Sequence, residues 1–320
     1  MPYYLGIDTS NYTTSLALCD AQGNIVAQQK KILQVKSGSR GLRQSEAVFQ
    51  HLQNLPVLSQ ALFADVPQAC NHLSAIGYSQ TPRPISGSYM PCFVPGETFS
   101  NFLCAYANLP CYPFSHQEGH IMAALYSAHA MHLLNRTFLA FHISGGTTDL
   151  LVVQGTESGM QITPVATSQD LHAGQLIDRV GVMLNLPFPC GPALEKLAND
   201  YRGKPFSPKI CVRNGSCHLS GAENQAKALF QSGASPEAVA AYVFTFLQNT
   251  ICKMICEALQ THPSCPILFV GGVMSNHFMR PTLQTICDAH FAAPNFSADN
   301  AAGTALLAYR SHLANISSSR

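Results

Sequence analysis

Two histidines four residues apart, His116 and His120, have the spacing that most directly indicates chemistry in this sequence. Ser115 precedes them and the apolar run 121–126 follows, which is typical of a helix that starts with a serine N-cap. Side chains four positions apart lie on one face of a helix, so two imidazoles there can hold one metal ion. The ordinary alternative is a polar helix start, with one residue capping and the other exposed.

Two glycine turns are candidates for binding phosphate. Ser144-Gly145-Gly146-Thr147-Thr148 offers several backbone N–H groups with little side chain in the way. Gly271-Gly272 follows a predicted strand and leads into a helix predicted from about Met274, whose N-terminus would favour an anion. Gly-Gly turns are also common without a ligand, and the second one could simply allow a strand and a helix to pack closely.

Three further positions could complete a nucleotide or metal site. Asp178, on a predicted helix, could accept a hydrogen bond from a ribose hydroxyl, or could be a surface acid paired with Arg179. Pro189-Cys190-Gly191-Pro192 is a stiff turn that could lie against a ribose or base. Asp299 brings a carboxylate to the start of the last predicted helix, where its ordinary role would be an N-cap.

Composition limits the class of protein. The 320 residues are 47% hydrophobic and 11% charged, enough for a large core in one α/β unit or two lobes. The net charge of +1 gives no global basic field for nucleic acid, so any RNA would bind at a local patch.

The start of the chain and its cysteines indicate a cytoplasmic protein. The first residues lack a basic n-region, and no apolar run reaches the ~18 residues of a membrane span, so we expect no membrane association. The twelve cysteines are scattered without a Cys-x-x-Cys motif. We expect them to be reduced, buried thiols, including Cys252 and Cys256 on one helix.

The predicted elements repeat one plan in two halves. Strand, polar turn and strand open the first half at 3–19, and strand, glycine turn and strand open the second at 138–153. A strand at 111–114 delivers the histidine pair, whose helix is expected to run to about Leu134. Lobes of the actin-like ATPase fold begin in this way. We therefore expect one lobe of residues 1-134 plus 298-320 and a second of 135-297.

Taken together, the chain resembles the TsaD/Gcp family, the glycoprotease-like (peptidase M22) proteins that act as the threonylcarbamoyl-transfer subunit for adenosine 37 of tRNA. The resemblance runs nearly end to end and depends on seven motifs in the family's order. These are Gly6-Ile7-Asp8-Thr9-Ser10, His116-x-x-x-His120, Ile143 to Thr148, Ala173-Gly174 through Asp178, Pro189-Cys190-Gly191-Pro192, Gly271-Gly272-Val273-x-x-Asn276 and Asp299-Asn300.

The resemblance implies an α/β, two-lobe actin-like ATPase (ASKHA) fold with a duplicated core and an interlobe cleft. It implies one divalent metal ion, iron or zinc, on His116, His120 and Asp299. It also implies ATP or an acyl-adenylate as ligand. The positions matching the nucleotide- and substrate-binding residues are Asp8, Ser144, Gly145, Gly146, Thr147, Thr148, Asp178, Gly191, Gly271, Gly272 and Asn276. The family's partners are tRNA and the TsaB-like and TsaE-like proteins.

His142 is an additional candidate ligand. A histidine at the end of an apolar strand is usually a hydrogen-bonded core residue. In the implied two-lobe fold, however, this strand end would face the helix that carries His116 and His120. Some relatives place a metal-binding tyrosine at the matching position. A third imidazole would then tie metal binding to lobe closure.

Three departures from the family's pattern affect the acceptor. The first loop reads Asn11-Tyr12-Thr13 where relatives usually carry two acids, and the second turn continues as Thr147-Thr148-Asp149. The last motif ends in Ala301 instead of glycine. We therefore expect a metal-dependent, adenylate-binding carbamoyl-type transferase. The alternatives are a paralogue with a small-molecule acceptor and a non-catalytic nucleotide-binding partner, although such scaffolds typically lack the histidine pair.

Overall fold

The chain folds into two compact units, each built on a five-stranded sheet. A computed structural model describes residues 1–10, 12–35, 42–297 and 299–318. Unit 1 comprises residues 1–135, 154–162 and 295–320, and unit 2 comprises 136–153 and 163–294. Relative to the division expected from sequence, the tip of one hairpin, 154–162, is grouped with unit 1.

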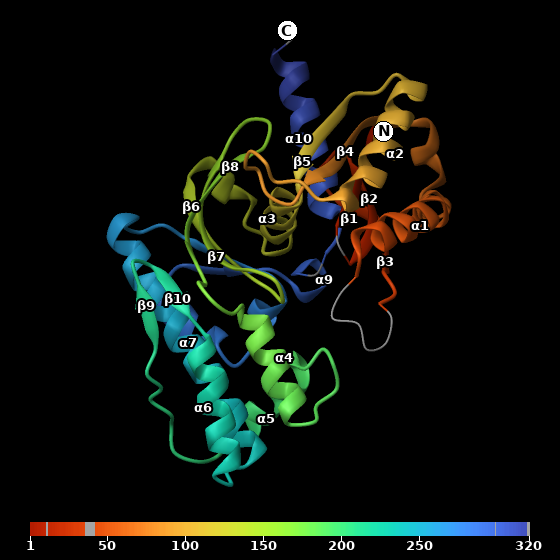
Figure 1. The fold of residues 1–320 in the computed structure, drawn as a ribbon. Coiled ribbons are helices and arrows are strands. Elements are labelled where there is room, and N and C mark those ends of the chain that lie inside the picture. Colours follow the sequence, from red (N-terminus) through yellow and green to blue (C-terminus); the bar gives the residue numbers. More distant parts are fainter. Residues whose placement is uncertain (11, 36–41, 298, 319–320) are drawn as a thin grey trace. The chain divides into compact units, whose positions relative to one another are not determined.

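Unit 1 has the strand order β3-β2-β1-β4-β5, with β1–β2 and β2–β3 antiparallel and β1–β4 and β4–β5 parallel. Its strands are β1 (Tyr3–Ser10), β2 (Thr13–Asp20), β3 (Ile25–Ile32), β4 (Leu73–Thr81) and β5 (Cys111–Ser115). Its helices are α1 (Gln44–Asp65), α2 (Val94–Ala107), α3 (His116–Ser127) and α10 (Ala302–Ser318), and a short helix α9 (Pro294–Ser297) begins at its edge. Figure 1 labels all the strands of this sheet and some strands of the second sheet.

Helices cover both faces of the first sheet. Successive strand residues point to opposite faces, and every residue of β1 is buried. Gly6 lies directly against the backbone of α10, whereas the side chain of the next residue, Ile7, reaches α2 near Gly96. The sheet is therefore enclosed between α10 and α2, which explains why β1 is a continuous buried run instead of an alternating one.

Unit 2 contains the second sheet and a mainly helical segment. Its sheet has the order β12-β11-β6-β7-β8. The strands are β6 (Thr137–Ile143), β7 (Thr148–Gly155), β8 (Met160–Thr167), β11 (Ile267–Val270) and β12 (Ala289–Phe291), and a separate hairpin pairs β9 (Cys211–Arg213) with β10 (Ser216–His218). The helices are α4 (Ala173–Met183), α5 (Gly191–Asp200), α6 (Ser220–Gln231), α7 (Pro236–Thr261) and α8 (Arg280–Ile286).

The core of unit 2 lies between its sheet and α7. Phe141 and Phe269, on the paired strands β6 and β11, stack with ring centroids 5.7 Å apart. Buried residues of α7, from Val239 to Met254, belong to the same apolar cluster. This helix is long and apolar enough to cross a membrane by length and composition alone, although it is not an uninterrupted apolar run, and 67% of its apolar window is buried inside the protein. Its apolar character is therefore explained by core packing.

Several expectations from sequence are wrong at the level of elements. The helix that starts at His116 ends at Ser127, not near Leu134, and a 3-10 turn follows at Met131–Asn135. The helix expected from about Met274 is a 3-10 turn, Gly272–Ser275, and α8 begins only at Arg280. The cysteines are all free thiols, but not all are buried: Cys70 and Cys256 are exposed, and Cys111, Cys211, Cys252, Cys265 and Cys287 are only partly buried.

Candidate metal and nucleotide sites

The histidine pair stands at the start of α3, as the sequence predicts. The Ser115 hydroxyl accepts a hydrogen bond from the Glu118 N–H at 3.2 Å, and the Glu118 carboxylate accepts one from the Ser115 N–H at 2.7 Å. This reciprocal capping box fixes the first turn of the helix. His116 and His120 therefore project from a rigid turn, and Glu118 has a structural role there.

Asp299 reaches the histidines because α10 packs closely on α3. A side chain at Gly303 would meet the backbone of Gly119 and Ala123, so the two helices can approach this closely only with glycine there. The ordinary N-cap role is not filled by Asp299, since Asn300 Oδ1 accepts the hydrogen bond from the Ala302 N–H at 3.1 Å. The Asp299 carboxylate faces His116 and His120 instead.

The three candidate ligand atoms lie close to one point. His120 Nε2 is 2.9 Å from His116 Nε2 and 3.1 Å from Asp299 Oδ1. The third side, from His116 Nε2 to Asp299 Oδ1, measures 3.6 Å. Nitrogen and oxygen ligands about 2.0–2.1 Å from zinc in a tetrahedral site lie about 3.3 Å apart, so the observed triangle has the right size. Within the described residues, these three form the one group of at least three His, Cys, Asp or Glu side chains with metal-ligand spacing.

The charges around the histidines favour a cation. Burial alone would lower the pKa of His116, but the carboxylates of Asp8 and Asp299 outweigh it and raise the pKa to about 10. Burial would likewise raise the pKa of Asp299, and its hydrogen bonds to His116 and His120 hold it well below the usual range instead. Two carboxylates thus surround the imidazoles, and a divalent metal ion would match their charge in place of a proton.

The second candidate site is a cavity of about 460 Å³ inside unit 2. Its size is that of a small-molecule pocket. Five of the positions predicted for nucleotide binding line it and come from different segments of unit 2: Gly145, Asp178, Gly191, Gly272 and Asn276. A side chain at Gly145 or Gly272 would meet nothing within 4 Å, so the space beside both backbones is open to a ligand.

The remaining predicted positions of the glycine turns shape the cavity without lining it. Ser144 N–H bonds to the Thr147 carbonyl, which closes the turn, and Thr148 Oγ1 accepts from the Ala173 N–H that opens α4. Gly271 has φ +97° and lies against the backbone of Ile143. These contacts are structural. Gly146 is open on its side-chain face but is not among the lining residues.

Asp178 and Glu195 are two carboxylates that line the same cavity, and Glu195 was missed by the sequence reasoning. Asp178 Oδ1 accepts from the Cys190 N–H at 2.9 Å, which ties α4 to the turn before α5. Its suggested partner Arg179 pairs with Glu223 instead. Glu195 lies four residues after Gly191, one helical turn into α5, and this spacing is the signal that could have identified it.

Neither His142 nor Asp8 is among the residues that line this cavity. His142 is 7% exposed on β6 and is not a member of the three-ligand group; its role as a ligand stays a prediction. Asp8, predicted to bind nucleotide or substrate, lies in unit 1 at the end of β1, with Oδ1 3.1 Å from His116 Nδ1. Asn11 and Ala298 lie outside the described residues.

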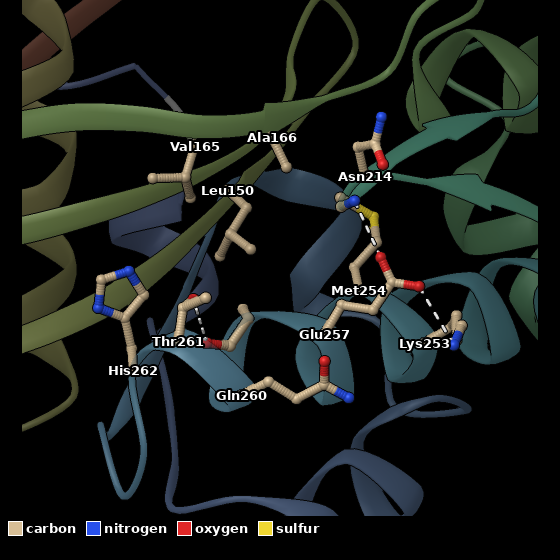
Figure 2. A pocket seen from close by; sticks show the side chains of 12 residues that line it. Leu150, Val165, Ala166, Asn214, Lys253, Met254, Glu257, Gln260, Thr261 and His262 are labelled. Atoms are coloured by element: carbon tan, nitrogen blue, oxygen red, sulfur yellow. Dashed lines mark hydrogen bonds and ion pairs between the residues drawn. The ribbon is translucent and has the colours of Figure 1, made fainter.

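A further cavity of about 490 Å³ in unit 2 contains none of the predicted residues (Figure 2). It lies between Leu150 and Val165 of the sheet and the end of α7. Its acidic residue Glu257 is already engaged by the Gly215 N–H at 2.9 Å and by Lys253 at 3.1 Å. These contacts stabilise the β9–β10 hairpin against α7. We therefore assign no ligand to the cavity.

The fold defines the class of protein. The structure is similar to HypF of T. kodakarensis, with a TM-score of 0.63, 11% identity and coverage of 99% of this chain and 48% of that chain. It is also similar to component A of (R)-2-hydroxyglutaryl-CoA dehydratase from Acidaminococcus fermentans, with a TM-score of 0.55, 15% identity and coverage of 98% and 100%. The fold is the α/β, two-lobe, actin-like ATPase (ASKHA) fold, which confirms the expected class.

The sequence then defines the family. The profile described as "TsaD: tRNA N6-adenosine threonylcarbamoyltransferase" matches residues 21–306. A tRNA N6-adenosine threonylcarbamoyltransferase of Thermus thermophilus is 28% identical over 316 residues, 97% of this chain and 93% of the relative. One from Chromobacterium violaceum is 28% identical over 218 residues, 68% of this chain and 61% of the relative. The chain belongs to the TsaD family of transferase enzymes, as its motifs indicate.

Proposed function

We propose that the chain is a metal-dependent, adenylate-binding transferase that moves a threonylcarbamoyl group from its adenylate to adenosine 37 of tRNA. The observation that carries this proposal is the triangle of His116, His120 and Asp299. Its residues fit a metal in donor chemistry, spacing and charge. Two imidazoles and one carboxylate leave open coordination positions, which is typical of catalytic and not structural metal sites.

The metal would act as a Lewis acid that polarises the carbonyl of the transferred group. The protein's own residues would bind and orient the adenylate. The open backbones at Gly145 and Gly272 suit phosphate or carboxylate oxygens, and Asp178 and Glu195 can accept hydrogen bonds from the two ribose hydroxyls. The apolar walls, which include Ile177 and Phe244, would hold the adenine.

The loop at residues 11–13 bears on whether tRNA is the acceptor. Tyr12 and Thr13 stand where relatives usually carry acids, and neither supplies a negative charge at neutral pH. A positioned general base typically contributes 10²–10⁴-fold, so activity toward tRNA without a compensating group should be low. A transferase with a small-molecule acceptor is therefore the second candidate. A non-catalytic partner protein is less favoured, because it would have no use for the ligand triangle.

The test is mass spectrometry of tRNA nucleosides from cells that lack this chain. Restoring the wild-type chain should restore threonylcarbamoyl-adenosine, and restoring the His120→Ala variant should not. Purified chain, supplied with TsaB-like and TsaE-like partners and tRNA, should give the same result at a low rate. If the nucleoside is unchanged in every strain, tRNA is not the acceptor and the small-molecule alternative takes its place.

A further inference from the structure

The proposed metal site uses only one of the two ring nitrogens of His116. Nε2 belongs to the triangle with His120 and Asp299, while Nδ1, on the other side of the ring, lies 3.1 Å from Asp8 Oδ1. A neutral imidazole carries its proton on one nitrogen and a lone pair on the other. Whichever group binds Nδ1 therefore decides whether Nε2 has a lone pair for a metal.

Asp8 is the group that lies at Nδ1 of His116. It is 1% exposed at the end of the buried strand β1, and its second oxygen, Oδ2, accepts a hydrogen bond from Ser10 Oγ at 2.7 Å. Both oxygens are thus engaged, so the carboxylate has little freedom to turn. A buried carboxylate is costly unless it is paired, and among the described residues Asp8 pairs with the imidazole of His116.

We propose that Asp8 is a positioning residue that accepts a hydrogen bond from the Nδ1–H of His116 and so keeps Nε2 free to bind metal. A carboxylate behind a metal-bound histidine orients the ring and raises the basicity of the ligating nitrogen. The inference rests on the proposed metal site, and it gives Asp8 a role beside the nucleotide- or substrate-binding one that the sequence suggests.

The first experiment compares Zn²⁺ affinity, measured by competition with a chromophoric chelator, in the wild type and in Asp8→Asn. Asparagine keeps the shape of the side chain and removes its charge. Loss of such a partner typically costs 10–100-fold in metal affinity, and we expect a loss in that range. Asp149→Asn is the matched control. Asp149 is also almost fully buried and accepts a hydrogen bond, from Thr167 Oγ1 at 2.7 Å, but it does not belong to the ligand triangle. The Zn²⁺ affinity of Asp149→Asn should stay within about twofold of the wild type.

The second experiment needs no variant and so does not depend on whether Asp8→Asn folds. Long-range ¹H–¹⁵N correlation spectra of the zinc-loaded wild type should show His116 protonated at Nδ1 and bound through Nε2. Zinc on Nδ1, or equal affinities for wild type and Asp8→Asn, would overturn the role of Asp8 while leaving the metal site intact. A wild type that binds no Zn²⁺ would instead overturn the metal site, and the inference with it.

Discussion

At the scale of single residues, the side chains that cap the helix ends are not those of the ligand triangle. Ser115 and Glu118 form the hydrogen bonds that cap the start of α3. Asn300 accepts a hydrogen bond from the N–H of Ala302, the first residue of α10. The helix ends are therefore stabilised by other side chains, and His116, His120 and Asp299 can face one another.

The nucleotide cavity gives a prediction at the same scale, with Gly272→Arg. The open space beside Gly272 lets the fold accept a side chain, which would then fill the cavity. ATP affinity, measured by calorimetry, should fall at least tenfold. Gly221→Arg is the control, because this glycine of α6 is equally open but does not line the cavity. Equal ATP affinity in both variants and the wild type would remove the nucleotide from this cavity.

At the scale of elements, α1 is tied to the first sheet by a buried polar cluster. His51 Nδ1 lies 2.8 Å from Thr14 Oγ1 on β2, and Asn54 Nδ2 donates to the same hydroxyl at 3.1 Å. His51 is fully buried, and this burial lowers its pKa from 6.5 to about 4, although Asp8 acts in the opposite direction. Protonation of His51 therefore opposes folding.

The stability of the fold should consequently depend on pH through His51. Its folded pKa is below the unfolded value, so its contribution is complete above pH 6.5 and is lost as the pH falls toward 4. Between pH 7 and pH 5 this loss amounts to about 2 kcal/mol of the free energy of unfolding. Denaturant titrations of wild type and His51→Gln should differ by this amount in their pH dependence. His72→Gln, at an exposed position, should behave like wild type, and an identical profile for His51→Gln would contradict the assignment.

At the scale of the whole molecule, unit 1 presents apolar side chains that its own core does not use. Phe49, Leu52 and Val57 of α1 are more than half exposed, and Phe102 and Tyr106 of the neighbouring α2 are exposed by 69% and 85%. Aromatic side chains of this kind are typical anchors of protein interfaces. The resemblance of the motifs implies a TsaB-like partner, and we propose that it binds these exposed side chains.

A charge on this surface should weaken the partner complex. We expect the Phe49→Asp and Tyr106→Asp variants each to lower the affinity for a TsaB-like protein at least tenfold, as measured by analytical ultracentrifugation, without changing the unfolding midpoint. Val182→Asp, at a 60% exposed position of α4 in unit 2, is the matched control and should bind like wild type. Unchanged binding by both α1 and α2 variants would place the partner on another surface.

The sequence by itself determined what depends on short spacings. The i,i+4 histidine pair with its serine cap, the glycine turns after buried strands and the repeated strand order all follow from local rules, and the structure contains them. The motifs also identified the family correctly. Local rules failed where helix length depended on packing, as at Ser127 and Gly272.

The tertiary structure decided which distant side chains meet. Asp8 and Asp299 lie 108 and 179 residues from the histidines that they contact, and no spacing rule connects such positions. The two contacts arise because β1 ends beside α3 and because Gly119 and Gly303 let α3 and α10 approach closely. Sequence spacing therefore predicts that His116 and His120 lie on one helix face. Tertiary packing places Asp299 in the triangle and Asp8 behind His116.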